Sequence, residues 1–203
     1  MKKIEGASLF KISYGLYVVT CNDGKKDNGL VVNTVIQQAS TPLTISVTIS
    51  KQNYSHDVIK ETKKLNVNCL TINTPFSIFE QFGFKSGKDT DKLKDVFHWK
   101  SANGLPVLSG EIINAFFSLE VTDYIDLGSH GLFICNVIEA THISDDESMT
   151  YDYYHKHVKP KKKAKKSGYV CKICGYVHEG DTLPDDFVCP ICKHGAIDFE
   201  KIE

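Results

Sequence analysis

The chain lacks long apolar segments and the common glycine-rich nucleotide motifs. No stretch approaches the length needed to span a bilayer, and Glu5 and Lys11 interrupt the apolar residues near the N-terminus, so we expect neither a membrane span nor a signal peptide. No GxGxxG motif follows a predicted strand and no GxxxxGKS or GxxxxGKT motif occurs. A Rossmann nucleotide domain and a P-loop are therefore not supported.

Disulfides are also not expected, although the chain has seven cysteines. Three of them, Cys21, Cys69 and Cys135, are scattered and are interpreted as small buried apolar residues. This usage is typical of a protein in a reducing cytoplasm. The remaining composition, 41% hydrophobic and 24% charged over 203 residues, predicts one full soluble domain and a small second one.

Four cysteines near the C-terminus form two CxxC motifs. They are Cys171, Cys174, Cys189 and Cys192. Four thiolates predict a tetrahedral site for iron or zinc, and the fourteen residues between the pairs leave the choice of metal open. A segment this short holds little apolar core, so we expect the metal to provide much of its folding free energy.

The residues around these cysteines resemble those of rubredoxins. An aromatic residue, Tyr169, precedes the first pair, Gly175 and Tyr176 follow it, the second pair reads Cys-Pro-Ile-Cys, and Phe199 lies downstream. Lys193 stands where that family commonly has glycine. The resemblance implies a small metal-knuckle rubredoxin domain over residues 169–203 that binds one iron, with zinc as the substitute metal.

A lysine-rich segment, residues 156–168, precedes this domain. Six lysines and no acidic residue lie between residues 157 and 168. We interpret the segment as a solvated linker with an r.m.s. span on the order of 20 Å, and a membrane or nucleic-acid patch is the less favoured alternative. From Tyr169 onward there are three lysines and seven acidic residues, a net charge of −4 that disfavours nucleic acid as a partner.

Residues 1–155 are predicted to be mainly β (α+β). Alternation and β-branched runs predict strands at 16–20, 30–39, 43–49, 65–71, 112–124 and 130–140. Within 43–49, four residues are predicted to point inward: Leu43, Ile45, Val47 and Ile49. Predicted helices cover 7–15, 55–64 with Ser55 as N-cap, and 76–82. Many antiparallel strands with few helices predict a closed barrel rather than a doubly wound sheet.

The segment from Ser50 to Ser55 has the chemistry of a phosphate site. It combines hydroxyl groups, one lysine and the N–H groups of a predicted helix N-terminus, which favour an anion. Ser and Asn before a helix are more often simple caps, so the segment alone does not decide the function.

Three segments of the larger domain resemble the flavin-reductase-like FMN-binding split barrels. Residues 8–20 resemble the opening helix and strand of that family, residues 28–34 its NGxTANx strand, and residues 128–133 its GDHxLF strand. The resemblance implies an FMN-binding split β-barrel, commonly a homodimer. Asn33, Thr34 and Val35 would lie along the isoalloxazine or ribityl group with Gln37 nearby, and Ser50, Lys51, Asn53 and Ser55 would hold the phosphate.

Two further residues have open roles under this resemblance. His130 would lie near the flavin ring, or it is a packed, hydrogen-bonded structural residue. Trp99, the one tryptophan, covers the flavin or caps the barrel, and the cap is favoured.

A flavin barrel, a lysine-rich linker and a C-terminal rubredoxin together resemble the high-molecular-weight rubredoxins. The resemblance implies electron flow from NADH, or an NAD(P)H-linked donor, through FMN and a four-cysteine iron centre to a flavodiiron protein that reduces O2 or NO. No catalytic acid or base is predicted, because hydride transfer to flavin needs positioning more than proton transfer. The alternatives are an NAD(P)H:flavin or ferric reductase with a structural zinc ribbon, and a zinc-ribbon module that binds nucleic acid.

Overall fold

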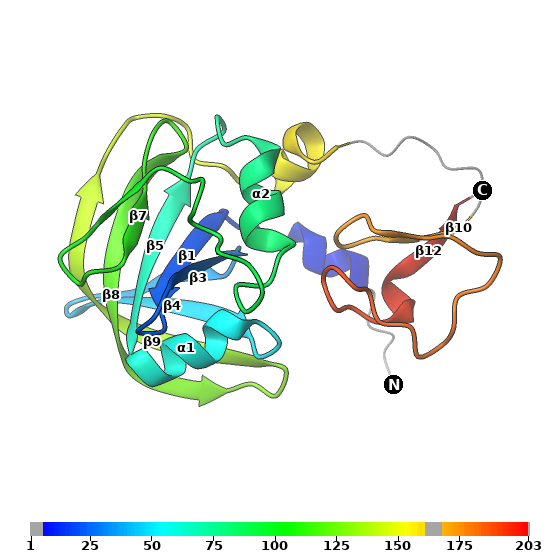
Figure 1. The fold of residues 1–203 in the computed structure, drawn as a ribbon, viewed down its shortest axis with the longest axis horizontal. Coiled ribbons are helices and arrows are strands. Elements are labelled where there is room, and N and C mark those ends of the chain that lie inside the picture. Colours follow the sequence, from blue (N-terminus) through cyan, green and yellow to red (C-terminus); the bar gives the residue numbers. More distant parts are fainter. Residues whose placement is uncertain (1–5, 161–167, 203) are drawn as a thin grey trace. The chain divides into compact units, whose positions relative to one another are not determined.

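The computed structural model describes residues 6–160 and 168–202, and the chain divides into two compact units, residues 1–159 and 160–203 (Figure 1). Most of the predicted linker, residues 161–167, lies outside the described residues. Within the described part, no helix is long and apolar enough to cross a membrane.

The larger unit is built on one seven-stranded antiparallel sheet, which confirms the prediction of a mainly β fold (Figure 1). The strand order is β2-β1-β5-β8-β9-β4-β3. The strands are β1 (Tyr17–Asn22), β2 (Asp27–Val32), β3 (Val35–Ser40), β4 (Leu43–Ser50), β5 (Lys64–Leu70), β8 (Ile113–Asp126) and β9 (His130–His142). The two longest strands, β8 and β9, form a hairpin that joins the two halves of the sheet.

Short helices lie before, between and after these strands. The first is a 3-10 helix, η1 (Gly6–Lys11), shorter than the predicted helix over 7–15. Helix α1 (Tyr54–Thr62) packs against β1 and β2, and α2 (Phe76–Gly83) packs against β2. The unit ends with α3 (Tyr151–Tyr153) and the π-helical turn η2 (Tyr154–Val158).

Two further predictions for the larger unit are wrong. The predicted strand over 30–39 is two strands, because the chain changes partner at Asn33: β2 pairs with β1, whereas β3 pairs with β4. Thr34 fixes this corner, since its hydroxyl donates to the Thr48 carbonyl over 2.6 Å. The N-cap of α1 is Asn53 rather than Ser55, which lies in the first helical turn and is buried.

The core confirms most of the predicted inward positions. Ile45, Val47 and Ile49 of β4 are buried, but Leu43 is 40% exposed because it lies at the start of the strand, beyond the packed interior. Cys21 and Cys135 are buried as expected, whereas Cys69 is only partly buried, and the described cysteines form no disulfide.

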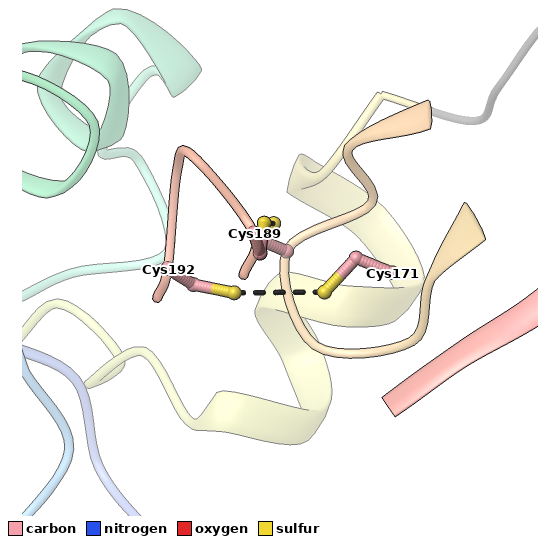
Figure 2. Close-up of side chains that lie close together, drawn as sticks. Cys171, Cys189 and Cys192 are labelled. Atoms are coloured by element: carbon pink, nitrogen blue, oxygen red, sulfur yellow. Dashed lines mark hydrogen bonds between the residues drawn. The ribbon is translucent and has the colours of Figure 1, made fainter. Parts of the chain in front are cut away.

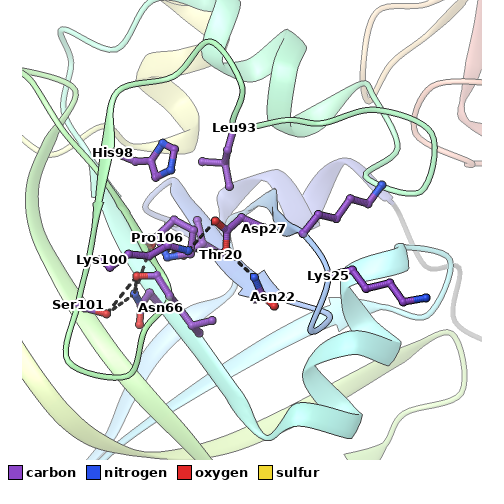
Figure 3. A network of polar contacts seen from close by, with 12 residues as sticks. Thr20, Asn22, Lys25, Asp27, Asn66, Leu93, His98, Lys100, Ser101 and Pro106 are labelled. Carbon is purple, nitrogen blue, oxygen red and sulfur yellow. Dashed lines mark hydrogen bonds and ion pairs between the residues drawn. The ribbon is translucent and has the colours of Figure 1, made fainter.

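A polar network holds a short hairpin against the sheet (Figure 3). The hairpin consists of β6 (His98–Lys100) and β7 (Pro106–Leu108). Lys100 pairs with Asp27 over 2.5 Å, and the buried Thr20 donates to the Pro106 carbonyl. Trp99 of this hairpin lies edge-on to the buried Phe116, with ring centroids 5.0 Å apart. This packing supports Trp99 as a cap of the barrel.

The smaller unit has a three-stranded antiparallel sheet and very little core. Its strands are β10 (Gly168–Cys171), β11 (Val177–His178) and β12 (Phe199–Ile202), in the order β11-β10-β12, with a 3-10 turn η3 (Ala196–Asp198) before the last strand. The buried residues of its apolar cluster are Cys171, Cys189 and Phe199. Phe187 packs edge-on against Phe199 with ring centroids 5.3 Å apart. Two of the three buried residues are thus thiols rather than hydrocarbons.

Candidate metal centre and flavin site

The smaller unit brings the thiols of its four cysteines together. The four Sγ atoms of Cys171, Cys174, Cys189 and Cys192 lie within 4.8 Å of one another. The Cys171 and Cys192 sulfurs are 3.5 Å apart and face each other (Figure 2), and those of Cys174 and Cys189 are 3.4 Å apart. A tetrahedral site with metal–sulfur bonds of about 2.3 Å has sulfurs about 3.8 Å apart. The donor set therefore fits a single four-thiolate metal.

Two matching turns position these sulfurs. In the first turn the Gly175 amide donates to the Cys171 carbonyl over 2.9 Å, and the Cys171 amide donates to the Tyr176 carbonyl over 2.8 Å. In the second turn Lys193 and His194 make the equivalent bonds with Cys189, over the same two distances. The Tyr176 amide also donates to the Cys174 sulfur over 3.5 Å. Lys193 therefore occupies the position in the second turn that Gly175 occupies in the first.

Without a cation, these four thiols cannot all ionise. Hydrogen bonds from Cys192 and from the Tyr176 amide lower the pKa of Cys174 to about 5. The same contact with Cys174 raises the pKa of Cys192, and burial raises the pKa of Cys189. One thiolate is thus stabilised at the expense of its neighbours, and a bound metal ion would remove this conflict by holding all four as thiolates.

The larger unit brings together part of the predicted flavin site. Ser50 at the end of β4 lies opposite His130 at the start of β9. The Lys51 amide donates to the Ser129 carbonyl over 3.0 Å, which ties the turn before α1 to the tip of the β8–β9 hairpin. Asn53 caps α1 without a side-chain hydrogen bond; its carbonyl accepts from the His56 amide over 2.9 Å, but its side chain accepts from none of the first N–H groups of this nine-residue helix. Together with Lys51, these donors suit a phosphate group.

The other predicted flavin residues lie nearby or face elsewhere. Asn33 and Thr34 form the corner between β2 and β3, and Val35 opens β3 opposite Val47. Gln37 lies on the exposed edge strand β3. Ser55 is buried and its hydroxyl accepts a hydrogen bond from Asn28. A role of Ser55 in phosphate binding through its hydroxyl stays a prediction.

His130 and Lys51 are both accessible. His130 is exposed, and its Nδ1 lies 2.8 Å from the Ser129 hydroxyl, so it is not a packed core residue. Lys51 forms an ion pair with Asp126 over 2.5 Å, which lowers the pKa of Asp126 and raises that of Lys51. Because the pair is open to solvent, it is weak, and Lys51 can exchange Asp126 for another anion.

A side-chain contact at the start of α1 was not predicted from the sequence. His56 is buried, and its Nε2 lies 3.2 Å from the Tyr124 hydroxyl, a residue 68 positions away in the chain. A Cβ at Gly131 would lie 2.4 Å from the Tyr124 ring and 2.6 Å from His56 Nε2. The glycine after His130 is therefore required by packing, and a glycine inside a strand was the one available signal.

Comparison with known proteins assigns both units. Residues 9–162 match the flavin reductase like domain, and residues 169–200 match the rubrerythrin, rubredoxin-like domain. The chain is also 34% identical, over an alignment of 226 positions, to the high molecular weight rubredoxin of Moorella thermoacetica, covering 96% of this chain and 98% of that protein. The chain belongs to the high-molecular-weight rubredoxin family.

Two further proteins resemble the chain over the length of the barrel. The ferric-chelate reductase (NAD(P)H) of Archaeoglobus fulgidus is 32% identical over 148 residues, covering 73% of this chain and 87% of that protein. The NADH:FAD oxidoreductase of Streptomyces globisporus C-1027 has a similar fold, with a TM-score of 0.65 at 18% identity over 74% of this chain and 92% of that one. The flavin-binding fold and the four-cysteine cluster support FMN and iron as the cofactors, and the relatives support an oxidoreductase.

Proposed function

We propose that this chain passes electrons from NADH or NADPH through FMN in the barrel to iron in the C-terminal unit, and from there to a flavodiiron-type O2 or NO reductase. When bound, the flavin accepts a pair of electrons as hydride and releases them singly, and the iron carries one electron at a time. The observation that carries the proposal is the joining of a four-thiol cluster within 4.8 Å to a flavin-reductase-like barrel in one chain.

The residues of the barrel would bind and orient the flavin rather than exchange protons with it. Lys51, the Ser50 hydroxyl and the first N–H groups of α1 would hold the phosphate. Asn33, Thr34 and Val35 form the nearby corner between two strands, and His130 lies across from Ser50. Accurate placement of the flavin ring supplies what hydride transfer needs, so no side chain is proposed as acid or base.

We also propose that the chain has three parts: the barrel over residues 1–155, the linker over 156–168 and the rubredoxin-like domain over 169–203. In this proposal residues 156–168, of which 161–167 lie outside the described residues, join the two domains and let the iron domain reach both the flavin and an external partner. The net charge of −4 from Tyr169 onward favours a partner with a basic docking surface.

A homodimer is part of the proposal. Cross-strand register places Ile36 and Ile125 on one face of the sheet, and their side chains are 56% and 45% exposed. A second copy of the chain would cover this apolar face. Light scattering of the purified protein measures the mass directly, and a monomer at micromolar concentration contradicts this part of the proposal.

The decisive experiment is metal analysis combined with an absorption spectrum before and after anaerobic addition of NADH. We expect flavin and ferric–thiolate bands in the purified protein and loss of both on reduction. Iron that stays oxidised while the flavin bleaches would overturn the relay. Faster electron transfer to a flavodiiron partner at low than at high ionic strength supports charge-guided docking.

The second candidate function is an NAD(P)H:flavin or ferric-chelate reductase with structural zinc in the C-terminal unit. It is favoured by the 32% identity to the Archaeoglobus fulgidus ferric-chelate reductase. The same experiment separates the two functions. A colourless, zinc-loaded C-terminal unit together with NAD(P)H-dependent reduction of ferric chelates favours this second function.

A further inference from the structure

Lys193 has a backbone conformation that lysine rarely adopts. Its φ is 62°, in the left-handed region, and Gly175 at the matching place in the first cysteine turn has φ 85°. Each amide donates to the carbonyl of the first cysteine of its own turn over 2.9 Å. In this region the Cβ of an L-residue lies too close to the following carbonyl oxygen, whereas glycine has no such contact. The second turn therefore keeps a strain that a glycine would avoid.

The side chain of Lys193 places a positive charge next to the metal ligands. It directly follows Cys192, so its ammonium lies on the order of 10 Å or less from that sulfur, about one Debye length at 0.1 M salt. The side chain is exposed, and none of the ion pairs found within residues 6–160 and 168–202 involves it. It is one of three lysines against seven acidic residues from Tyr169 onward.

We propose that Lys193 raises the reduction potential of the four-thiolate centre through its charge. The inference rests on the proposed iron occupancy. Reduction adds one electron to the centre, breaks no bond and requires no proton, so the reduced centre carries one more negative charge than the oxidised one. A nearby cation stabilises the reduced form more than the oxidised form, whereas the surrounding carboxylates act in the opposite sense.

Three substitutions separate charge from strain. Lys193→Gln removes the charge and keeps the strained Cβ, Lys193→Gly removes both, and Lys193→Arg keeps both. The potential is measured by anaerobic redox titration of the full chain with dithionite and mediators, followed at the ferric–thiolate absorbance. We expect the Gln and Gly variants to shift the equilibrium about two- to fivefold toward the oxidised form, roughly 20 to 40 mV at 59 mV per tenfold, and the Arg variant to match the wild type.

Salt concentration and metal release provide readouts independent of catalysis. The shift in the Gln variant should shrink between 0.1 M and 1 M salt, because the charge is exposed to solvent. In the zinc-loaded chain, transfer of metal to a chelator should slow only in the Gly variant, since only that change removes the strain. A Gln variant with the wild-type potential overturns the proposal, even if the Gly variant releases metal more slowly.

Failure of this inference is distinguishable from failure of the proposed function. Dithionite reduces the iron without NADH or FMN, so the effect of Lys193 on the potential is measured whether or not the electron relay operates. A centre that the protein holds as zinc shows no reduction in this range, and that result overturns the iron assignment on which both proposals rest.

Discussion

The two units of this chain are stabilised in different ways. The barrel has two apolar clusters of fifteen and thirteen buried residues, which include Phe116 and Phe133. The buried part of the corresponding cluster in the C-terminal unit consists of Cys171, Cys189 and Phe199. Burial of hydrocarbon can stabilise the barrel before any cofactor binds, whereas the smaller unit depends on bonds between thiolates and a metal. We therefore expect the two units to lose their structure independently, the barrel when core packing is lost and the smaller unit when its metal is lost.

The largest effect is expected for Cys189→Ala, which removes one of the four thiols. The C-terminal unit should lose its metal and its ordered structure, because metal binding supplies on the order of 10 kcal/mol of folding free energy in such sites. The barrel should still bind FMN. Metal content, ferric–thiolate absorbance and flavin content of the purified variant test this expectation.

Cys135→Ala is the matched control, since Cys135 is equally buried but lies in the barrel. It should leave the metal content unchanged. Retention of a full metal complement in Cys189→Ala would show that the four-thiol cluster is not the metal site.

The next effect in size is expected from a cavity in the barrel. Phe133→Ala removes a ring that is fully buried in the first cluster and should cost about 3–5 kcal/mol. Urea unfolding monitored by far-UV circular dichroism should show an earlier barrel transition, while the ferric–thiolate absorbance keeps its midpoint. If both signals shift together, the two units unfold as one and the comparison is wrong.

The sequence predicted the β-rich barrel and the metal cluster because both depend on local patterns. Ile45, Val47 and Ile49 alternate within one strand, and each CxxC pair forms its own turn. The break at Asn33 was missed because β-branched residues stand on both sides of Asn33 and Thr34, and the change of partner strand that separates β2 from β3 has no local signal.

Other features depend on contacts between distant residues. The burial of Ser55 depends on Asn28, which is 27 residues away, so a serine near a helix start was mistaken for a cap. The His56–Tyr124 contact spans 68 residues and has no local signature. The left-handed conformation of Lys193 was not predicted either, because nothing in the preferences of lysine indicates it.

We expect the stability of the barrel to depend on pH through Lys92, which lies in that unit. This lysine is buried, its ammonium donates to the carbonyls of Gly29 and Phe82, and burial lowers its pKa to about 8. Between pH 8 and its ordinary pKa, the unfolded chain binds the proton more tightly than the folded one. Below pH 8 the buried ammonium lowers the free energy of unfolding of the barrel. As the pH rises from 8 to the ordinary pKa of lysine, this destabilisation is relieved, by up to about 3 kcal/mol.

Comparison with Lys92→Met isolates this contribution. Burial raises the pKa of Cys21, Cys69 and Cys135 to about 12, so their ionisation favours unfolding above pH 9 in both proteins. The effect of Cys69 and Cys135 cancels when urea unfolding free energies of wild type and variant are subtracted at each pH, and Cys21, whose pKa the nearby Lys92 lowers, stays a thiol in both folded proteins up to pH 10. We expect the free energy of unfolding of the wild type, relative to that of Lys92→Met, to increase from pH 7.5 to pH 10. A constant difference would mean that Lys92 does not change its protonation in this range.

The smallest expected effect concerns Lys51, where the barrel depends on an exposed charge rather than on its core. Lys51→Gln should weaken FMN binding about tenfold, because the phosphate loses a charged donor while the helix N–H groups remain. Asp126→Asn should act in the opposite direction, since it frees Lys51 from its present partner. Lys25→Gln is the control, an exposed lysine in the β1–β2 turn.

Quenching of FMN fluorescence by the metal-loaded, flavin-depleted protein measures these affinities without turnover. Riboflavin, which lacks the phosphate, should bind wild type and Lys51→Gln equally, because the substitution removes only a contact to the phosphate. Equal FMN affinity in all three variants would place the phosphate away from the turn before α1. The flavin would then be held chiefly by the corner at Asn33 and Thr34, and its phosphate would be bound by other residues of the barrel.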